Sequence, residues 1–123
     1  MKINQKAISK NTLQKIEAEL ELAHKAREKG NAGKERVAAR RAIGLAIQSF
    51  YQHKGVEFTS QASFDSVRFM CDDDDISKEI KILLQHFTQR LKKDSPDEES
   101  YWPLNVVLIG EVRQVIDLLN NPE

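Results

Sequence analysis

Hydrophobic side chains recur along this chain with the spacing of helices rather than strands. Apolar positions are three or four residues apart, and no segment keeps the alternation of period two that marks a strand. The pattern predicts helices over about residues 11–29, 33–53, 63–71, 76–93 and 103–119. The sequence therefore predicts an all-α fold, an up-and-down helical bundle of four main helices plus one short helix.

Each predicted helix has an apolar face that should enter a common core. The face of the helix over 33–53 is the broadest and is rich in alanine, which lets neighbouring helices approach closely, so we expect it at the centre. The residues expected to face inward are Leu13, Ile16, Leu20, Ala23, Ala39, Ala42, Ile43, Ala46, Ile47, Phe50, Phe64, Val67, Met70, Ile76, Ile80, Leu83, Leu84, Phe87, Leu91, Leu104, Leu108, Val112, Val115, Ile116 and Leu119. Val107 and Leu118 widen the apolar arc of the last helix, which indicates packing between two helices or a dimer seam.

Residues with capping side chains mark the helix ends. The expected N-caps are Asn11 or Thr12, Asn31, and Asp74 or Asp75, and Gly30 should end the first helix. Residues 1–10 then form an N-terminal arm, and residues 11–120 a single helical-bundle domain.

Charge is balanced overall but divided unevenly along the chain. Lys plus Arg and Asp plus Glu each number 19, so the chain lacks the net positive field expected of a nucleic-acid binder. Residues 1–60 carry 12 basic and 6 acidic side chains, whereas residues 61–123 carry 7 basic and 13 acidic ones. Two explanations remain open: the halves complement each other within one molecule, or unlike patches drive self-association, head to tail or about a two-fold axis.

The single cysteine and the absence of long apolar runs bear on location. Cys71 lies beside Phe69 and Met70, so we expect it to be a small core residue, and one cysteine allows no intrachain disulfide. The N-terminal sequence lacks the apolar stretch of a signal peptide, and no run approaches the ~20 apolar residues that span a bilayer. We therefore expect a cytoplasmic protein with no membrane contact.

No motif for catalysis or for cofactor binding stands out. Neither G-x-G-x-x-G, nor a P-loop, nor G-x-S-x-G occurs in the chain. His24, His53 and His86 lie on different predicted helices without a neighbouring cysteine or histidine. The sequence thus predicts no catalytic residue, no metal and no cofactor, and favours a protein that is not an enzyme.

Two arginines on the central helix have two interpretations. Arg36 and Arg40 are one turn apart on the margin of its apolar face, where like charges repel and need anionic partners. Glu111, on the margin of the last helix, is one such partner and would form a bidentate pair with an arginine. Alternatively, Lys34, Arg36 and Arg40 form an anion-binding site for a phosphate or an RNA backbone near the start of the helix.

The central helix also resembles that of a known family. The stretch from Gly33 to Ile47, GKERVAARRAIGLAI, is similar to the alanine-rich core helix of small bacterial HEPN-like (higher eukaryote and prokaryote nucleotide-binding) domain proteins. The segments FDSVRFM and PLNVVLIGEVRQVIDLL are also similar in kind, which extends the resemblance over roughly residues 12–119.

The resemblance implies an α-helical bundle that is frequently homodimeric. Family members include ribonucleases, toxin components and catalytically silent binding proteins. The ribonuclease branch carries an arginine followed by a histidine after four to six residues, and this chain has no such pair. We therefore expect a non-catalytic HEPN-like binding or interaction module, homodimeric or bound to a protein partner. The alternative is a nucleotide- or RNA-binding member that uses the basic residues of the second helix.

Overall fold

The computed structural model describes residues 8–56, 63–88 and 108–120, and these form helices and turns without a strand. The helices are α1 (Lys10–Glu28), α2 (Ala32–His53), α3 (Ser63–Cys71), α4 (Lys78–Thr88) and α5 (Leu108–Asn120). The predicted all-α fold is confirmed. The expected continuations of α4 to residue 93 and of α5 back to residue 103 lie outside the described residues, as do the side chains of Phe64, Leu91, Leu104, Val107 and Leu108.

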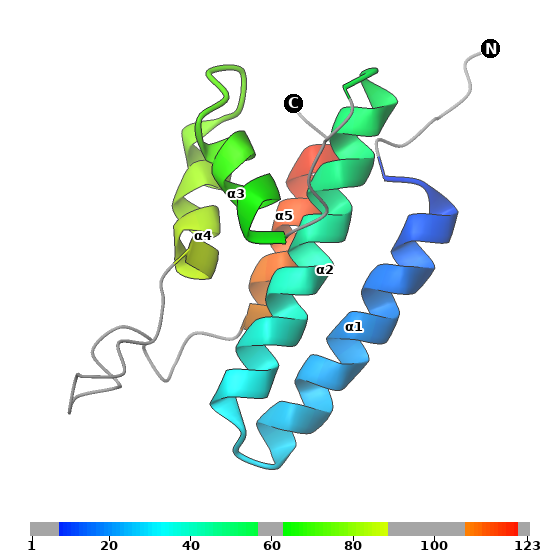
Figure 1. The fold of residues 1–123 in the computed structure, drawn as a ribbon, viewed down its shortest axis with the longest axis vertical. Helices are drawn as coiled ribbons and strands as arrows, with labels where there is room; N and C mark the ends of the chain where they lie inside the picture. Colours follow the sequence, from blue (N-terminus) through cyan, green and yellow to red (C-terminus); the bar gives the residue numbers. More distant parts are fainter. Residues whose placement is uncertain (1–7, 57–62, 89–107, 121–123) are drawn as a thin grey trace.

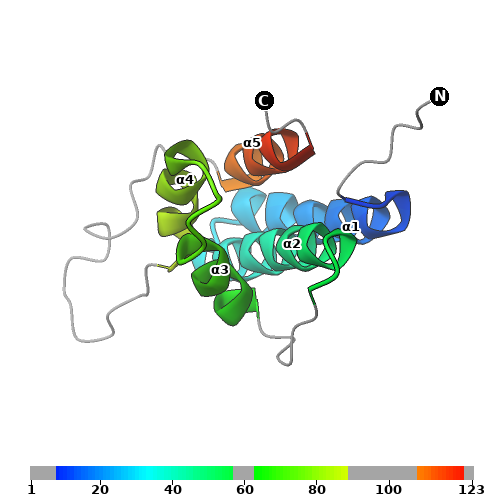
Figure 2. The ribbon, with the colours of Figure 1, turned by 90° about the horizontal axis from the view of Figure 1, so that it is seen from above.

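The helices form two antiparallel pairs and one further helix. Figure 1 shows α1 and α2 as one pair and α3 and α4 as the second, and Figure 2 shows α5 packed across the first pair. Because α2 contacts α1, α3 and α5, it occupies the centre, as its alanine-rich face predicts. No helix within the described part is long and apolar enough to cross a membrane.

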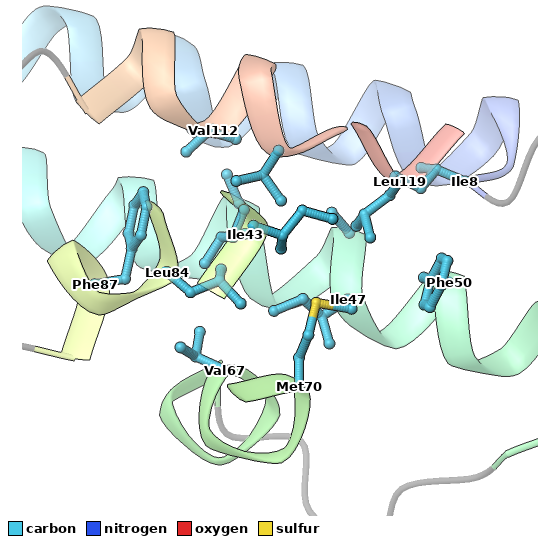
Figure 3. Packing of buried hydrophobic residues seen from close by; sticks show 14 of the residues in the cluster. Ile8, Ile43, Ile47, Phe50, Val67, Met70, Leu84, Phe87, Val112 and Leu119 are labelled. Carbon is cyan, nitrogen blue, oxygen red and sulfur yellow. The ribbon is translucent and has the colours of Figure 1, made fainter. Parts of the chain in front are cut away.

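The core lies where the second pair and α5 meet the inner face of α2. Figure 3 shows Ile43 and Ile47 of α2 surrounded by side chains from α3, α4 and α5. The fully buried members of this cluster include Ile16, Ala39, Ala42, Ile43, Ala46, Ile47, Val67, Met70, Leu84, Phe87, Val112 and Val115. These were all expected to face inward. Leu118 is partly buried against the cluster, and α5 contacts α1, α2 and α4, as the prediction of packing against more than one helix expects.

Three local predictions about the helix ends need correction. Ser9, rather than Asn11 or Thr12, caps α1, because its Oγ accepts a hydrogen bond from the Thr12 amide at 3.1 Å. Ser77, rather than Asp74 or Asp75, takes the same role at α4, where its Oγ accepts from the Ile80 amide at 3.3 Å.

The third correction concerns the N-terminal arm, which is shorter than predicted. Ile8 is buried in the core, and its amide donates to the Asn120 side chain at 3.2 Å. The folded part therefore begins before residue 10.

The turn between α1 and α2 forms as predicted. Gly30 has φ +73°, a left-handed conformation that glycine adopts without strain. The Asn31 amide donates to the Ala26 carbonyl at 2.8 Å and the Gly30 amide to that of Arg27 at 3.0 Å, which together make a Schellman motif. Asn31 then caps α2 by accepting from the Lys34 amide at 3.1 Å. The turn that orients the two helices is thus fixed by local chemistry.

Candidate functional site

A groove of about 520 Å³ lies between the C-terminal half of α1 and the N-terminal half of α2. We call it the basic groove. Its apolar lining includes Leu22 and Val37, which are 51% and 42% exposed. The remaining lining residues are Lys25, Ala26, Lys29, Asn31, Gly33, Lys34, Ala38 and Arg41. Four of the ten lining residues are cationic and none is acidic.

Helical spacing places these residues on one surface. Leu22, Lys25 and Lys29 follow one another at three and four residues, the spacing that keeps side chains on one helix face. Lys34, Val37 and Arg41 repeat the same pattern on α2. Neither stripe belongs to the core, so both sets of side chains reach solvent beside each other.

Ion pairs hold the walls of the basic groove together. Glu35 is buried, and its Oε2 accepts a hydrogen bond from Arg27 Nη1 at 2.9 Å, which joins α1 to α2 just behind the turn. Arg41 Nε lies 3.1 Å from Glu19 Oε1, and this pair joins α2 to α1 at the other end of the groove. Because Arg41 already has this carboxylate, the free positive charge of the groove comes mainly from its lysines.

The structure separates the three residues of the predicted anion site. Lys34 lines the basic groove, whereas Arg36 is buried and Arg40 Nε donates to the Phe87 carbonyl of α4 at 3.0 Å. At 3.6 residues per turn, Lys34 and Arg36 point about 200° apart around α2. Lys34 therefore lies on a different side of α2 from Arg36 and Arg40, so the three residues do not form one surface.

Glu111 also has a different partner from the one predicted. Its Oε1 lies 2.5 Å from Nδ1 of His86 on α4. The placement of α4 explains this difference. His86 of α4 contacts Glu111, and the carbonyl of the next residue, Phe87, accepts the hydrogen bond from Arg40, so α4 contacts both Glu111 and Arg40. The prediction that Glu111 pairs with Arg36 or Arg40 is therefore wrong, because its carboxylate pairs with His86.

A second, acidic hollow of about 720 Å³ lies between the C-terminal end of α2, α3 and the segment that connects α3 to α4. We call it the acidic edge; it is lined by Tyr51, Val56, Phe69, Asp72, Asp73, Asp74 and Asp75. The Tyr51 hydroxyl donates to Asp73 Oδ2 at 2.5 Å, and Asp73 Oδ1 accepts from the Asp75 amide at 2.9 Å. Phe69 is 45% exposed and packs edge to face on Tyr51, with ring centroids 4.9 Å apart.

These contacts set the ionisation of the acidic edge. The hydrogen bond from Tyr51 and that from the Asp75 amide stabilise the carboxylate and lower the pKa of Asp73. Burial and the neighbouring Asp73 raise the pKa of Tyr51, so this hydroxyl keeps its proton at neutral pH. The Tyr51–Asp73 bond is therefore stronger when Asp73 is ionised.

Replacing Tyr51 with phenylalanine is expected to destabilise the protein by about 1 kcal/mol at neutral pH, the typical net value of one hydrogen bond. A folded-state pKa below the unfolded value of about 3.9 adds stability that is present above that pH and is lost as the pH falls further. The difference between wild type and Tyr51→Phe should therefore shrink below about pH 4. Urea unfolding at pH 7 and at pH 3 measures this, and an equal difference at both pH values would contradict it.

The remaining candidates for chemistry do not come together. Cys71 is half-buried, and burial raises the pKa of its thiol, which opposes formation of the nucleophilic thiolate. It packs against the core cluster, as predicted. Among the described residues, no three His, Cys, Asp or Glu side chains are grouped so that they could hold a metal ion.

The basic groove was not predicted from the sequence pattern. Lys34 was a candidate, but Leu22, Lys25, Lys29, Val37 and Arg41 were not. The sequence did contain a signal. Leu22 and Val37 lie outside the apolar faces that enter the core, and each has cationic residues three or four positions apart on its own helix. Only the short turn at Gly30 indicates that the two stripes meet.

Comparison of the chain with protein-family models, with curated proteins and with solved structures finds no match in any of the three. The resemblance to HEPN-like proteins therefore stays a prediction.

Proposed function

We propose that this chain is a non-catalytic interaction module of HEPN-like type, acting in the cytoplasm, whose basic groove binds an acidic, partly apolar surface of a protein. The observation that carries the proposal is the composition of the groove: exposed Leu22 and Val37 lie among four cationic side chains with no acidic residue in the lining. An amphipathic helix with acidic flanks satisfies both features, since helices commonly lay an apolar face into such a groove.

The lining favours a protein over a nucleotide or RNA. Proteins that bind single-stranded nucleic acid combine cations with aromatic side chains on which the bases stack. The lining residues include no aromatic side chain. An apolar floor with a cationic rim instead matches a polypeptide that presents leucine-like side chains between carboxylates.

Binding of a designed peptide tests this proposal. We expect a fluorescent amphipathic helix, with leucine on one face and glutamate beside it, to bind the wild-type chain at low salt. Lys34→Glu should weaken that binding roughly fivefold, since one reversed contact is worth about 1 kcal/mol. Fluorescence anisotropy gives the affinities.

The position of Lys34 in the first turn of α2 means that Lys34→Glu should not disturb folding. Asn31 is the N-cap of α2, so Lys34 is the third residue of the helix, where a glutamate suits both the helix dipole and a capping box. Lys10→Glu is the matched control, because Lys10 begins α1, is exposed and does not line the groove. Equal loss of binding in both variants, or tighter binding of an RNA oligonucleotide than of the peptide, would refute the proposal.

A further inference from the structure

We propose that the partner of the basic groove is a second copy of this chain, which inserts its acidic edge, so that copies associate head to tail. This inference rests on the proposed function, because it names the occupant of the same groove. It also selects one of the two explanations of the uneven charge along the sequence.

The two surfaces complement each other in charge and in apolar character. Lys25, Lys29 and Lys34 surround the apolar floor of the groove. The acidic edge places the run Asp72–Asp75 around Phe69, a residue that is 45% exposed. A Phe69 ring over the groove floor would leave water while the aspartates meet the lysines. Opposite potentials of this kind steer two molecules together and fix their orientation.

The position of the two surfaces requires a second molecule. Figure 1 shows the α1–α2 turn at one end of the long axis and the connection from α3 to α4 at the other. The groove and the edge of one chain therefore lie toward opposite ends of the molecule and cannot meet. Because two different patches make the contact, each bound pair leaves one groove and one edge unfilled, and the association continues as an open chain or a closed ring.

Both surfaces are already ordered before they meet. The acidic edge is held by the hydrogen bonds from Tyr51 and from the Asp75 amide to Asp73. The walls of the groove are joined by the pair between Arg27 and Glu35 and by the turn at Gly30. Preorganised surfaces lose less conformational entropy on binding. A small contact of this type is nevertheless weak and depends on concentration.

The first experiment measures the mass of the wild-type chain by sedimentation and light scattering over a concentration series. In about 0.01 M salt the average mass should rise steadily above the 14.1 kDa of one chain and pass that of a dimer. In about 1 M salt, where charges are screened beyond roughly 3 Å, it should return to the mass of one chain. A monomer at every concentration in low salt, or a mass that stops at a dimer, would overturn the proposal.

The second experiment mixes two variants that each lack one surface. The groove variant is Lys29→Glu/Lys34→Glu, and the edge variant is Asp72→Lys/Asp74→Lys. Neither variant removes a contact that holds the fold together. Asp73, which accepts the hydrogen bond from Tyr51, is unchanged, and Lys29 and Lys34 are both exposed. Circular dichroism and thermal unfolding confirm that both variants are folded.

Each variant alone should be a monomer, because its groove and the edge of an identical molecule no longer carry opposite charges. The mixture should regain an average mass above the 14.1 kDa of one chain, because the groove of the edge variant still accepts the edge of the groove variant and the two charge-reversed surfaces also attract each other. Lys10→Glu should associate like the wild type. A mixture that stays monomeric overturns the head-to-tail arrangement. If the groove still binds the acidic peptide in that case, only this inference fails and the proposed function stands.

Discussion

Gly44→Ala is expected to destabilise this protein by roughly 2 kcal/mol, although alanine is ordinarily the better helix residue by about 1 kcal/mol. A Cβ at Gly44, in the middle of α2, would lie 2.7 Å from Ser63 Cβ and 2.9 Å from Ser63 Cα, where α3 begins. A flexible side chain could move aside, but the Cα is backbone. The start of α3 must therefore shift away from α2, which disturbs the packing of Val67 and Met70 behind it.

Gly110→Ala supplies the matched comparison. Gly110 is also helical, and a Cβ built there meets no atom within 4 Å, so the same substitution should stabilise the protein by up to about 1 kcal/mol. Urea unfolding of both variants measures the two changes in the free energy of unfolding. Stabilisation by Gly44→Ala would show that α3 does not approach α2 as closely as the structure places it.

The contrast between Gly44 and its neighbours shows what the sequence could predict. Ile43 and Ile47 were identified as core residues because burial along a helix follows the 3.6-residue period, a local property of the chain. The turn at Gly30 and the cap at Asn31 were also predictable, since both depend on hydrogen bonds within a few residues. The contact of Gly44 with Ser63 depends on where α3 crosses α2, and no pattern along the chain encodes that.

The errors at the candidate site have the same origin. The helical period placed Arg40 and Glu111 at the margins of apolar faces, where polar side chains need partners. It could not show that α4 offers His86 to Glu111 and the Phe87 carbonyl to Arg40. Likewise, the basic groove is built from two stripes whose members were visible singly, but whose juxtaposition depends on how α1 and α2 pack. Residue types and faces are thus predictable, whereas partners across helices require the three-dimensional structure.

The cap of α4 shows that chemistry alone can also mislead. Asp74 and Asp75 are good capping residues by type, and they lie beside the helix start. Asp73 instead accepts the Asp75 amide and the Tyr51 hydroxyl, which closes a turn in this segment and leaves Ser77 at the helix start. The aspartate run thus forms a turn that precedes the helix, and the N-cap is the residue directly before Lys78.

Leu84→Ala is expected to give the largest loss of stability, about 3–4 kcal/mol, within the range measured for buried leucines. Leu84 of α4 is fully buried, and Figure 3 shows it in the cluster that contains Ile47, Val67 and Met70. Removing its side chain forfeits the transfer energy and leaves a cavity that helices from three sides can fill only in part.

Ile82→Ala is the control within the same helix, because Ile82 is 60% exposed and has a side chain of the same size. Its change in the free energy of unfolding should stay within about 0.5 kcal/mol, since little apolar surface leaves water at that position on folding. Urea unfolding compares the two variants directly. Equal effects would mean that α4 is rotated about its axis relative to the structure, whereas a loss confined to Leu84→Ala fixes the face that α4 turns to α2. That orientation also places His86 against Glu111, so the same pair of variants tests the packing that overturned the predicted arginine–glutamate pair.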